Sequence, residues 1–120
     1  MRVKIVLGAF LLFLTLTAAR SQTSPVGYMQ VSQNLNTPSS GPVLISIGIF
    51  IYPGNFSLRI YNSVGEVIRT LEDTNLTGVW TKTYSWDGTN AHGARVASGI
   101  YIIRGQDSSE VFNSRIAVHH

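Results

Sequence analysis

One stretch of this chain carries most of its structural information: residues 86–93 read WDGTNAHG, and residues 96–101 read VASGIY. An aromatic strand end runs into an Asp-Gly turn, and a second turn built on Gly93 follows. A small Ser-Gly step at Gly99 then leads into an aliphatic and aromatic strand. This pattern is typical of the corner of a β-sheet, and it contains no recognisable catalytic apparatus.

Strand-like segments separated by turn residues lie on both sides of this corner. Residues 43–51 place valine or isoleucine at every second position, which is the period of a strand with one buried face. Further strands are expected at residues 56–61, 66–71, 79–86, 99–104 and 111–118, with one short edge strand at residues 28–31. The pattern predicts an all-β, immunoglobulin-like β-sandwich of about seven antiparallel strands.

The segments between these strands carry turn chemistry. Tyr52-Pro53-Gly54-Asn55 fits a type II turn, because proline presets φ and glycine supplies a positive φ. Gly65 suits the left-handed position of a hairpin loop. Residues 72–78 are expected to form a polar loop, and residues 106–109 a turn.

The first residues have the layout of a secretory signal peptide rather than of a folded element. Two positive charges precede an apolar run at residues 5–16, and small residues follow it. Cleavage after Ala19 and cleavage after Ser21 both fit, and the later cut is preferred. We therefore expect a signal peptide at residues 1–21, a polar leader or linker at 22–40 and one domain at 41–120, with no membrane span after cleavage.

Removing the signal peptide changes the charge of the chain. The nine basic and six acidic residues give a net charge of +3, but three of the basic residues precede residue 22. The mature chain is therefore balanced and has no basic patch, which argues against a nucleic-acid partner. The absence of cysteine means that burial and strand pairing stabilise the domain without disulfides, as fits an exported bacterial envelope protein.

With these elements in place, the chain resembles a known family. The segment LRIYNSVGEVIRTL at residues 58–71 is similar to a central hairpin of that family, and YSWDG at 84–88 with VASGIY at 96–101 matches the rest. These segments resemble the immunoglobulin-like domain of the flagellar hook-capping protein, a module also found at the C-termini of secreted bacterial surface proteins. The structural motif that carries the resemblance consists of Gly65, Trp86, Asp87, Gly88, Gly93, Gly99 and Tyr101. The export signal argues against a flagellar role.

The residues near the corner that could act in catalysis or binding are better explained by structural roles in turns and packing. Asp87, His92 and Ser98 supply the residue types of a hydrolytic triad, but no nucleophile elbow accompanies them. Asp87 is expected to accept hydrogen bonds from its own turn, and Trp86 to pack between the sheets. A calcium-binding loop starting at Asp87 would need oxygen ligands at alternate positions, and the alternate positions are Thr89 and Ala91, so the series fails. No catalytic, cofactor-binding or metal-binding residue is therefore predicted.

Three hypotheses for function remain open. The first is an exported, non-enzymatic structural or adhesive module of the cell envelope, surface or medium. The second is a small carbohydrate- or peptide-binding module, for which Trp80 is the candidate contact residue because it is the aromatic of its strand expected to be exposed. The third is a filament subunit that associates through its sheet edges, with the leader donating a strand.

Overall fold

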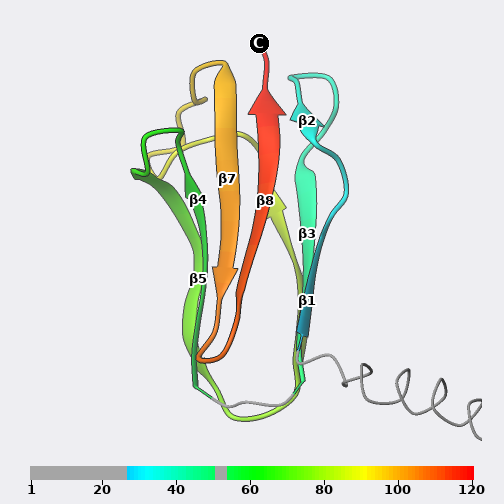
Figure 1. Cartoon of the computed structure of the whole chain (residues 1–120). Coiled ribbons are helices and arrows are strands. Elements are labelled where there is room, and N and C mark those ends of the chain that lie inside the picture. Colours follow the sequence, from blue (N-terminus) through cyan, green and yellow to red (C-terminus); the bar gives the residue numbers. More distant parts are fainter. Residues whose placement is uncertain (1–26, 51–53) are drawn as a thin grey trace, which may run out of the picture.

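In a computed structural model, which describes residues 27–50 and 54–120, eight strands form two sheets that pack face to face (Figure 1). The strands are β1 (Gly27–Val31), β2 (Leu35–Asn36), β3 (Val43–Ile49), β4 (Gly54–Tyr61), β5 (Val67–Leu76), β6 (Trp80–Trp86), β7 (Gly99–Gln106) and β8 (Val111–Val118). One sheet has the order β1-β3-β6 and the other β2-β8-β7-β4-β5. The predicted all-β, immunoglobulin-like sandwich is confirmed.

The core lies between the two sheets and follows from the alternation along their strands. On β3, all four valine and isoleucine side chains at alternate positions are fully buried, whereas Leu44 on the opposite face is 44% exposed. They face buried aromatic and aliphatic side chains from β4, β7 and β8 across the sandwich. The side chains buried here are Val43, Ile45, Ile47, Ile49, Phe56, Leu58, Ile60, Leu76, Tyr84, Trp86, Val96, Tyr101, Ile103, Ile116 and Val118.

The N-terminal part of the domain connects both sheets. Strand β1 pairs antiparallel with β3, and after a short turn β2 pairs with β8. The second pairing is parallel, so the expectation of a purely antiparallel sandwich is wrong at this edge. The segment 22–40 was expected to be a leader with one edge strand, and its described part supplies two strands, the second of which places Asn36 in the interior, 1% exposed. A two-residue strand has no period by which a sequence reveals it.

Strand β5 is longer than the sequence suggested. Residues 72–78 were expected to be a polar loop, but the strand continues to Leu76, which is 4% exposed. Glu72 and Asp73 pair with Leu58 and Ser57 of β4, and two register shifts follow further along the same pair of strands. Because β5 is the edge of its sheet, charged side chains are tolerated there and protect the edge from pairing with other chains.

Several expectations fall on residues 1–26 and 51–53, which lie outside the described residues. They include the signal peptide, both cleavage positions, and the Tyr52-Pro53 half of the predicted type II turn. Gly54 is described and is the first residue of β4, with φ at 145°. Within residues 27–50 and 54–120, no helix is long and apolar enough to cross a membrane.

Tyr28 holds the edge strand β1 against its neighbour. The ring of Tyr28 lies over Gly48, where a Cβ atom would come within 2.3 Å of the tyrosine Cε1. The same ring is 5.9 Å from that of Phe50. An aromatic ring over a glycine covers exposed backbone and fixes strand register.

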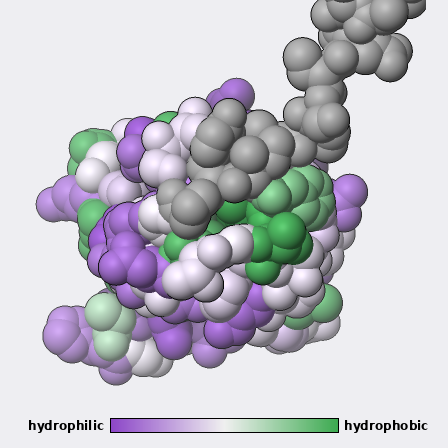
Figure 2. Space-filling model, turned by 90° about the horizontal axis from the view of Figure 1, so that it is seen from below, coloured by the Kyte–Doolittle hydropathy of each residue, from purple (hydrophilic) through white to green (hydrophobic). Residues whose placement is uncertain are grey.

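Figure 2 views the sandwich from the end opposite the C-terminus and shows a hydrophobic area beside the grey residues, within a largely hydrophilic surface.

We expect Gly48→Val to loosen β1, because the new side chain would occupy the place of the Tyr28 ring. The free energy of unfolding should fall by about 1–3 kcal/mol. Hydrogen exchange, followed residue by residue, should be faster for the β1 amides than for those of β7. Gly99→Val is the matched control, since a Cβ at Gly99 meets nothing within 4 Å. Equal protection of β1 in both variants would contradict the assignment.

Candidate functional site

The sheet corner is organised around Trp86, the last residue of β6. Its side chain is 0% exposed, and its ring lies 5.9 Å from that of Tyr101 at an angle of 59°. A buried indole still needs a partner for its N–H group. The indole Nε1 donates to the carbonyl oxygen of Thr89 at 2.8 Å, so the turn that follows the strand supplies that partner.

Asp87 and Gly88 build this turn. A carboxylate oxygen of Asp87 accepts hydrogen bonds from the Thr89 amide at 3.2 Å and from the Thr89 hydroxyl. Gly88 has φ at 81°, and a Cβ there would lie 2.5 Å from a guanidinium nitrogen of Arg95. Arg69 of β5 reaches the same carboxylate at 3.5 Å. The hydrogen bond from the Thr89 hydroxyl lowers the pKa of Asp87 below its ordinary value of 3.8.

The second turn is closed by Asn90. Its side-chain oxygen accepts from the amides of His92 at 2.9 Å and of Ala94 at 3.1 Å. Gly93 has φ at 84° and donates its amide to the Asn90 carbonyl at 3.0 Å. The side chain of His92 is exposed. Asn90 was not singled out from the sequence, although asparagine two and four residues before the bonded amides is a known turn signal.

The other motif residues occupy positions of different kinds. The hydroxyl of Tyr101, which is 6% exposed, donates to the Ala97 carbonyl at 2.7 Å. Gly65 has φ at 89° in the β4–β5 hairpin, where its amide donates to Asn62 at 3.1 Å. Gly99 is exposed, begins β7 and has neither a positive φ nor a close neighbour. The motif is thus a set of turn and core positions, with Gly99 the one whose lack of a side chain the geometry does not explain.

The residue types of a hydrolytic triad are not brought together. The carboxylate of Asp87 bonds Thr89, and Ser98 accepts the backbone amide of His120 at 3.1 Å. Within the described residues no hydrogen bond joins Asp87, His92 and Ser98. His120, at the end of the chain, contacts the Val96 carbonyl through its ring at 2.7 Å. The described part of the chain also holds no group of three or more His, Asp or Glu side chains that could bind a metal ion.

Trp80 lies on the edge strand β6, in a cluster that closes one side of the sandwich. The Tyr84 hydroxyl donates to Glu72 of β5 at 2.9 Å, and Lys82 reaches the same carboxylate at 3.4 Å. Burial, and then the hydrogen bond to Glu72, raise the pKa of Tyr84. Lys82 lies 5.0 Å from the Tyr84 ring centre and 5.9 Å from that of Trp80. Trp80 is partly buried and packs against the core, and its Nε1 atom is buried.

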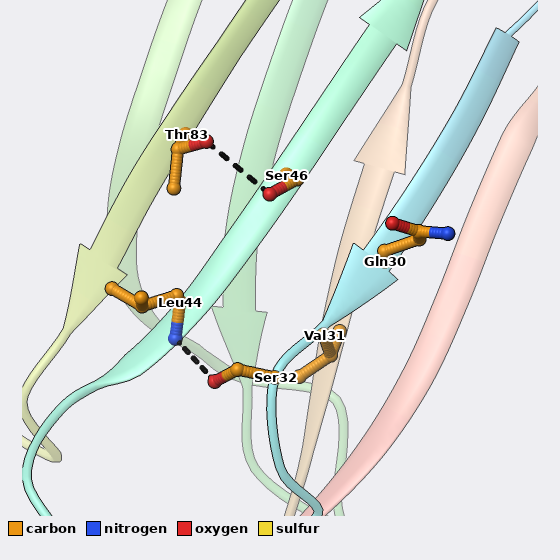
Figure 3. A pocket seen from close by; sticks show the side chains of 6 residues that line it. All are labelled: Gln30, Val31, Ser32, Leu44, Ser46 and Thr83. Carbon is orange, nitrogen blue, oxygen red and sulfur yellow. Dashed lines mark hydrogen bonds between the residues drawn. The ribbon is translucent and has the colours of Figure 1, made fainter.

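One hollow among the described residues lies on the outer face of the three-stranded sheet, with a volume of about 580 Å³. Figure 3 shows the Ser46 and Thr83 hydroxyls directed toward each other, 3.2 Å apart, and the Ser32 hydroxyl accepting the Leu44 amide at 2.9 Å. The lining residues are Gln30, Val31, Ser32, Leu44, Ser46 and Thr83. All six are uncharged, so the hollow offers no acid–base group.

Two further hollows, of about 300 and 440 Å³, lie on the outer face of the five-stranded sheet and share Ile102. Arg104 lines the first and Arg115 the second. Ile102, Arg104 and Arg115 were not predicted from the sequence as site residues. The signal was present, because residues 99–106 carry isoleucine at both even and odd positions, so both faces of this strand are apolar.

The fold and the corner together define a class of protein, an immunoglobulin-like β-sandwich module. The motif residues of its corner form turns and pack between the sheets. Residues 54–109 match the family model described as the FlgD Ig-like domain. The chain therefore contains an FlgD Ig-like domain at residues 54–109, and the resemblance predicted from the sequence is confirmed.

Solved structures show where similar domains occur. PorZ, described as an essential bacterial surface component of the type-IX secretion system of Porphyromonas gingivalis, matches with 27% identity and a TM-score of 0.50 over 77% of this chain. Dimeric latent PorU from Porphyromonas gingivalis matches with 17% identity and a TM-score of 0.50 over 80% of this chain, a likeness of fold alone. The chain spans only 11% of PorZ and 10% of PorU. No curated protein matches the sequence.

We expect Trp86→Ala to lower the free energy of unfolding by about 3–5 kcal/mol, as removing a fully buried large aromatic side chain does. Trp86→Phe keeps part of the packing but leaves the Thr89 carbonyl without its donor, and should cost less. Urea unfolding of the full chain followed by circular dichroism measures both values. A loss below about 1 kcal/mol for Trp86→Ala would show that the corner does not depend on the indole.

The pKa of Asp87 makes a small part of the stability depend on pH. Because folding lowers this pKa, the carboxylate stabilises the folded state above its unfolded pKa, and that stabilisation disappears as the pH falls through the folded pKa. Wild type should therefore be more stable than Asp87→Asn at neutral pH, and the difference should shrink as the pH falls below 3.8. Urea unfolding at a series of pH values measures it.

Thr89→Val is the companion variant, since it removes the hydroxyl that lowers the pKa of Asp87. In that background the pH dependence of the Asp87→Asn difference should be reduced. A difference that stays constant from neutral pH to about pH 2 would contradict the role assigned to the carboxylate.

Proposed function

We propose that this chain is an exported, non-enzymatic module of the bacterial cell surface that acts by binding another protein. The observation that carries the proposal is the 27% identity to a region of PorZ, a bacterial surface component, over 77% of this chain. Since the chain spans 11% of PorZ, the proposal extends to this chain the surface location of PorZ and not the activity of the whole protein.

The geometry of the corner supports a non-enzymatic role. The polar groups of Trp86, Asp87 and Tyr101 at the corner are bonded to neighbouring residues of the fold. Catalysis requires polar groups that converge on a substrate rather than on their own turns. The protein therefore works through its surface.

The carbohydrate-binding alternative is weaker. It depends on an indole ring that lies flat and open to solvent, and Trp80 instead packs against the core with Lys82 near its ring. A protein partner is favoured because the outer sheet faces offer broad, shallow surfaces rather than a deep pocket.

Cell fractionation of the bacterium that produces the chain tests the proposal, with an antibody raised against the purified domain. We expect the chain, after removal of its signal peptide, at the cell surface or in the medium. Protease added to intact cells should digest it. The control is a variant without residues 1–21, which should stay inside the cell. Finding the full chain with the cytoplasmic markers would exclude the proposed location.

A further inference from the structure

An apolar row crosses the five-stranded sheet on its outer face. Strands β7 and β8 lie side by side in this sheet, with β4 and β5 beyond β7 and β2 beyond β8 (Figure 1). The row follows opposed residues from β2 to β7, steps from Ile100 to Ile102 along β7, and continues through opposed residues to β5. We call this the apolar row: Leu35, Ala117, Ile100, Ile102, Tyr61 and Val67.

Three of the six residues of the apolar row are exposed, and the other three, Ala117, Ile102 and Tyr61, are half-buried. Leu35 and Ile100 are each 47% exposed, and Val67 is 53% exposed. Single exposed apolar side chains are ordinary on protein surfaces, but apolar side chains that neighbour one another across a whole sheet favour an interaction surface. Tyrosine in the middle of such a line is a residue type enriched at the energetic centres of interfaces.

Arginines border the apolar row. Arg115 lies opposite Ile102 on β8, and Arg104 follows Ile102 on the same face of β7. Arg59 pairs with Asp73 at 2.9 Å. In the described residues, Arg104 and Arg115 form no hydrogen bond or ion pair. Two guanidinium groups are thus free to bind carboxylates on another molecule, which arginine does in a bidentate geometry.

The placement of Arg104 is unfavourable for the isolated domain. It lies directly opposite Arg59 on the neighbouring strand, and like charges in this arrangement repel. Asp73 on β5 compensates Arg59 but is two strands away from Arg104. A second carboxylate, brought by a partner, would compensate Arg104.

The sheet edges are less suited to binding. Strand β5 carries two register shifts and several charges, and β2 has only two residues. On the edge strand β6, Lys82 lies on the inner face and contacts Glu72. Each of these features hinders the addition of a further strand. The face of the five-stranded sheet is therefore the better candidate surface.

We infer that this face docks a partner protein whose contact surface combines apolar side chains with aspartate or glutamate side chains placed against Arg104 and Arg115. The inference rests on the proposed surface role and names the partner's chemistry. A sheet face with aliphatic side chains and arginine, and without lysine on these strands, fits the composition of protein–protein interfaces.

Site-specific photocross-linking of the full chain in its own bacterium tests this. A benzophenone amino acid replaces Ile100 in the apolar row, and in a matched control it replaces Leu44 on the opposite sheet, which is 44% exposed against 47% for Ile100. We expect one discrete protein adduct from position 100 and none from position 44. Mass spectrometry of the cross-linked partner peptide should find Asp or Glu beside apolar residues.

Charge reversal provides the second arm. Arg104→Glu with Arg115→Glu should reduce the adduct by at least about tenfold, the effect of opposing a charge at an interface. Thr83→Glu on the other sheet should leave it unchanged. Arg104→Glu also replaces the repulsion with Arg59 by attraction, so its Tm should be equal to or higher than that of the wild type. Loss of binding without loss of stability separates docking from a structural role.

Several outcomes would overturn the inference: no protein adduct at position 100, an adduct with a second copy of this chain, a lipid or polysaccharide adduct, or an adduct that survives charge reversal. If fractionation shows export, the proposed surface location remains supported after any of these outcomes. Conversely, a charge-dependent protein adduct in cells that retain the chain in the cytoplasm would support the docking face and exclude the proposed location.

Discussion

A tryptophan that is completely buried must still satisfy its one polar group, and this requirement shapes the most distinctive part of the molecule. The indole of Trp86 closes one end of the core, and its N–H group finds the carbonyl of Thr89 three residues further on. The chain must therefore turn back at once. Asp87 accepts the Thr89 amide and fixes that turn, and Gly88 is needed because its φ of 81° is one that residues with a side chain rarely adopt. The sequence Trp-Asp-Gly-Thr is thus one physical unit.

Stability in a small domain without disulfides also depends on how the N-terminal segment is used. Strand β1 extends the three-stranded sheet, and β2 crosses to the five-stranded sheet, so a short segment joins both layers. On the opposite side, Tyr84, Lys82 and Glu72 connect β6 to β5. The sandwich is closed laterally at both sides by polar or backbone contacts, while its interior is almost wholly aliphatic and aromatic. Small domains bury a limited fraction of their surface, so such closures matter.

Much of this fold could be predicted from the sequence because local rules and global packing agree. Alternation along residues 43–49 and 80–86 places the isoleucines of β3 and the side chains of Tyr84 and Trp86 on the inner face, where the structure has them. Trp80 was expected to be exposed and is instead partly buried against the core. The exceptions have physical causes. Residues 72–76 look like a loop because Glu, Asp and Asn are poor strand formers, yet an edge strand accepts them. Strand β2 is too short to show any period.

The candidate surface was harder to predict, because it depends on residues that are far apart in the sequence. Chemically versatile residues gather near the corner, and turn geometry accounts for Asp87 and Asn90 there. Ile100 and Ile102 were visible as apolar residues on the second face of their strand, but nothing local shows that Leu35 and Tyr61 join them in one row. That information lies in the strand order, which sets β2 and β4 on either side of the β8–β7 pair.

The same strand order accounts for the charges on the proposed docking face. Register places Arg59 against Arg104, and a single carboxylate on β5 cannot neutralise both. A domain selected for stability alone would carry opposite charges at such a pair, since a cross-strand ion pair stabilises where a like pair repels. The repulsion costs the free domain little at a hydrated surface, because water and salt screen exposed charges. When a partner excludes water, the guanidinium group of Arg104 binds a carboxylate of that partner far more strongly. An arrangement that is slightly unfavourable in the free domain is therefore what a reversible, charge-selective docking face requires.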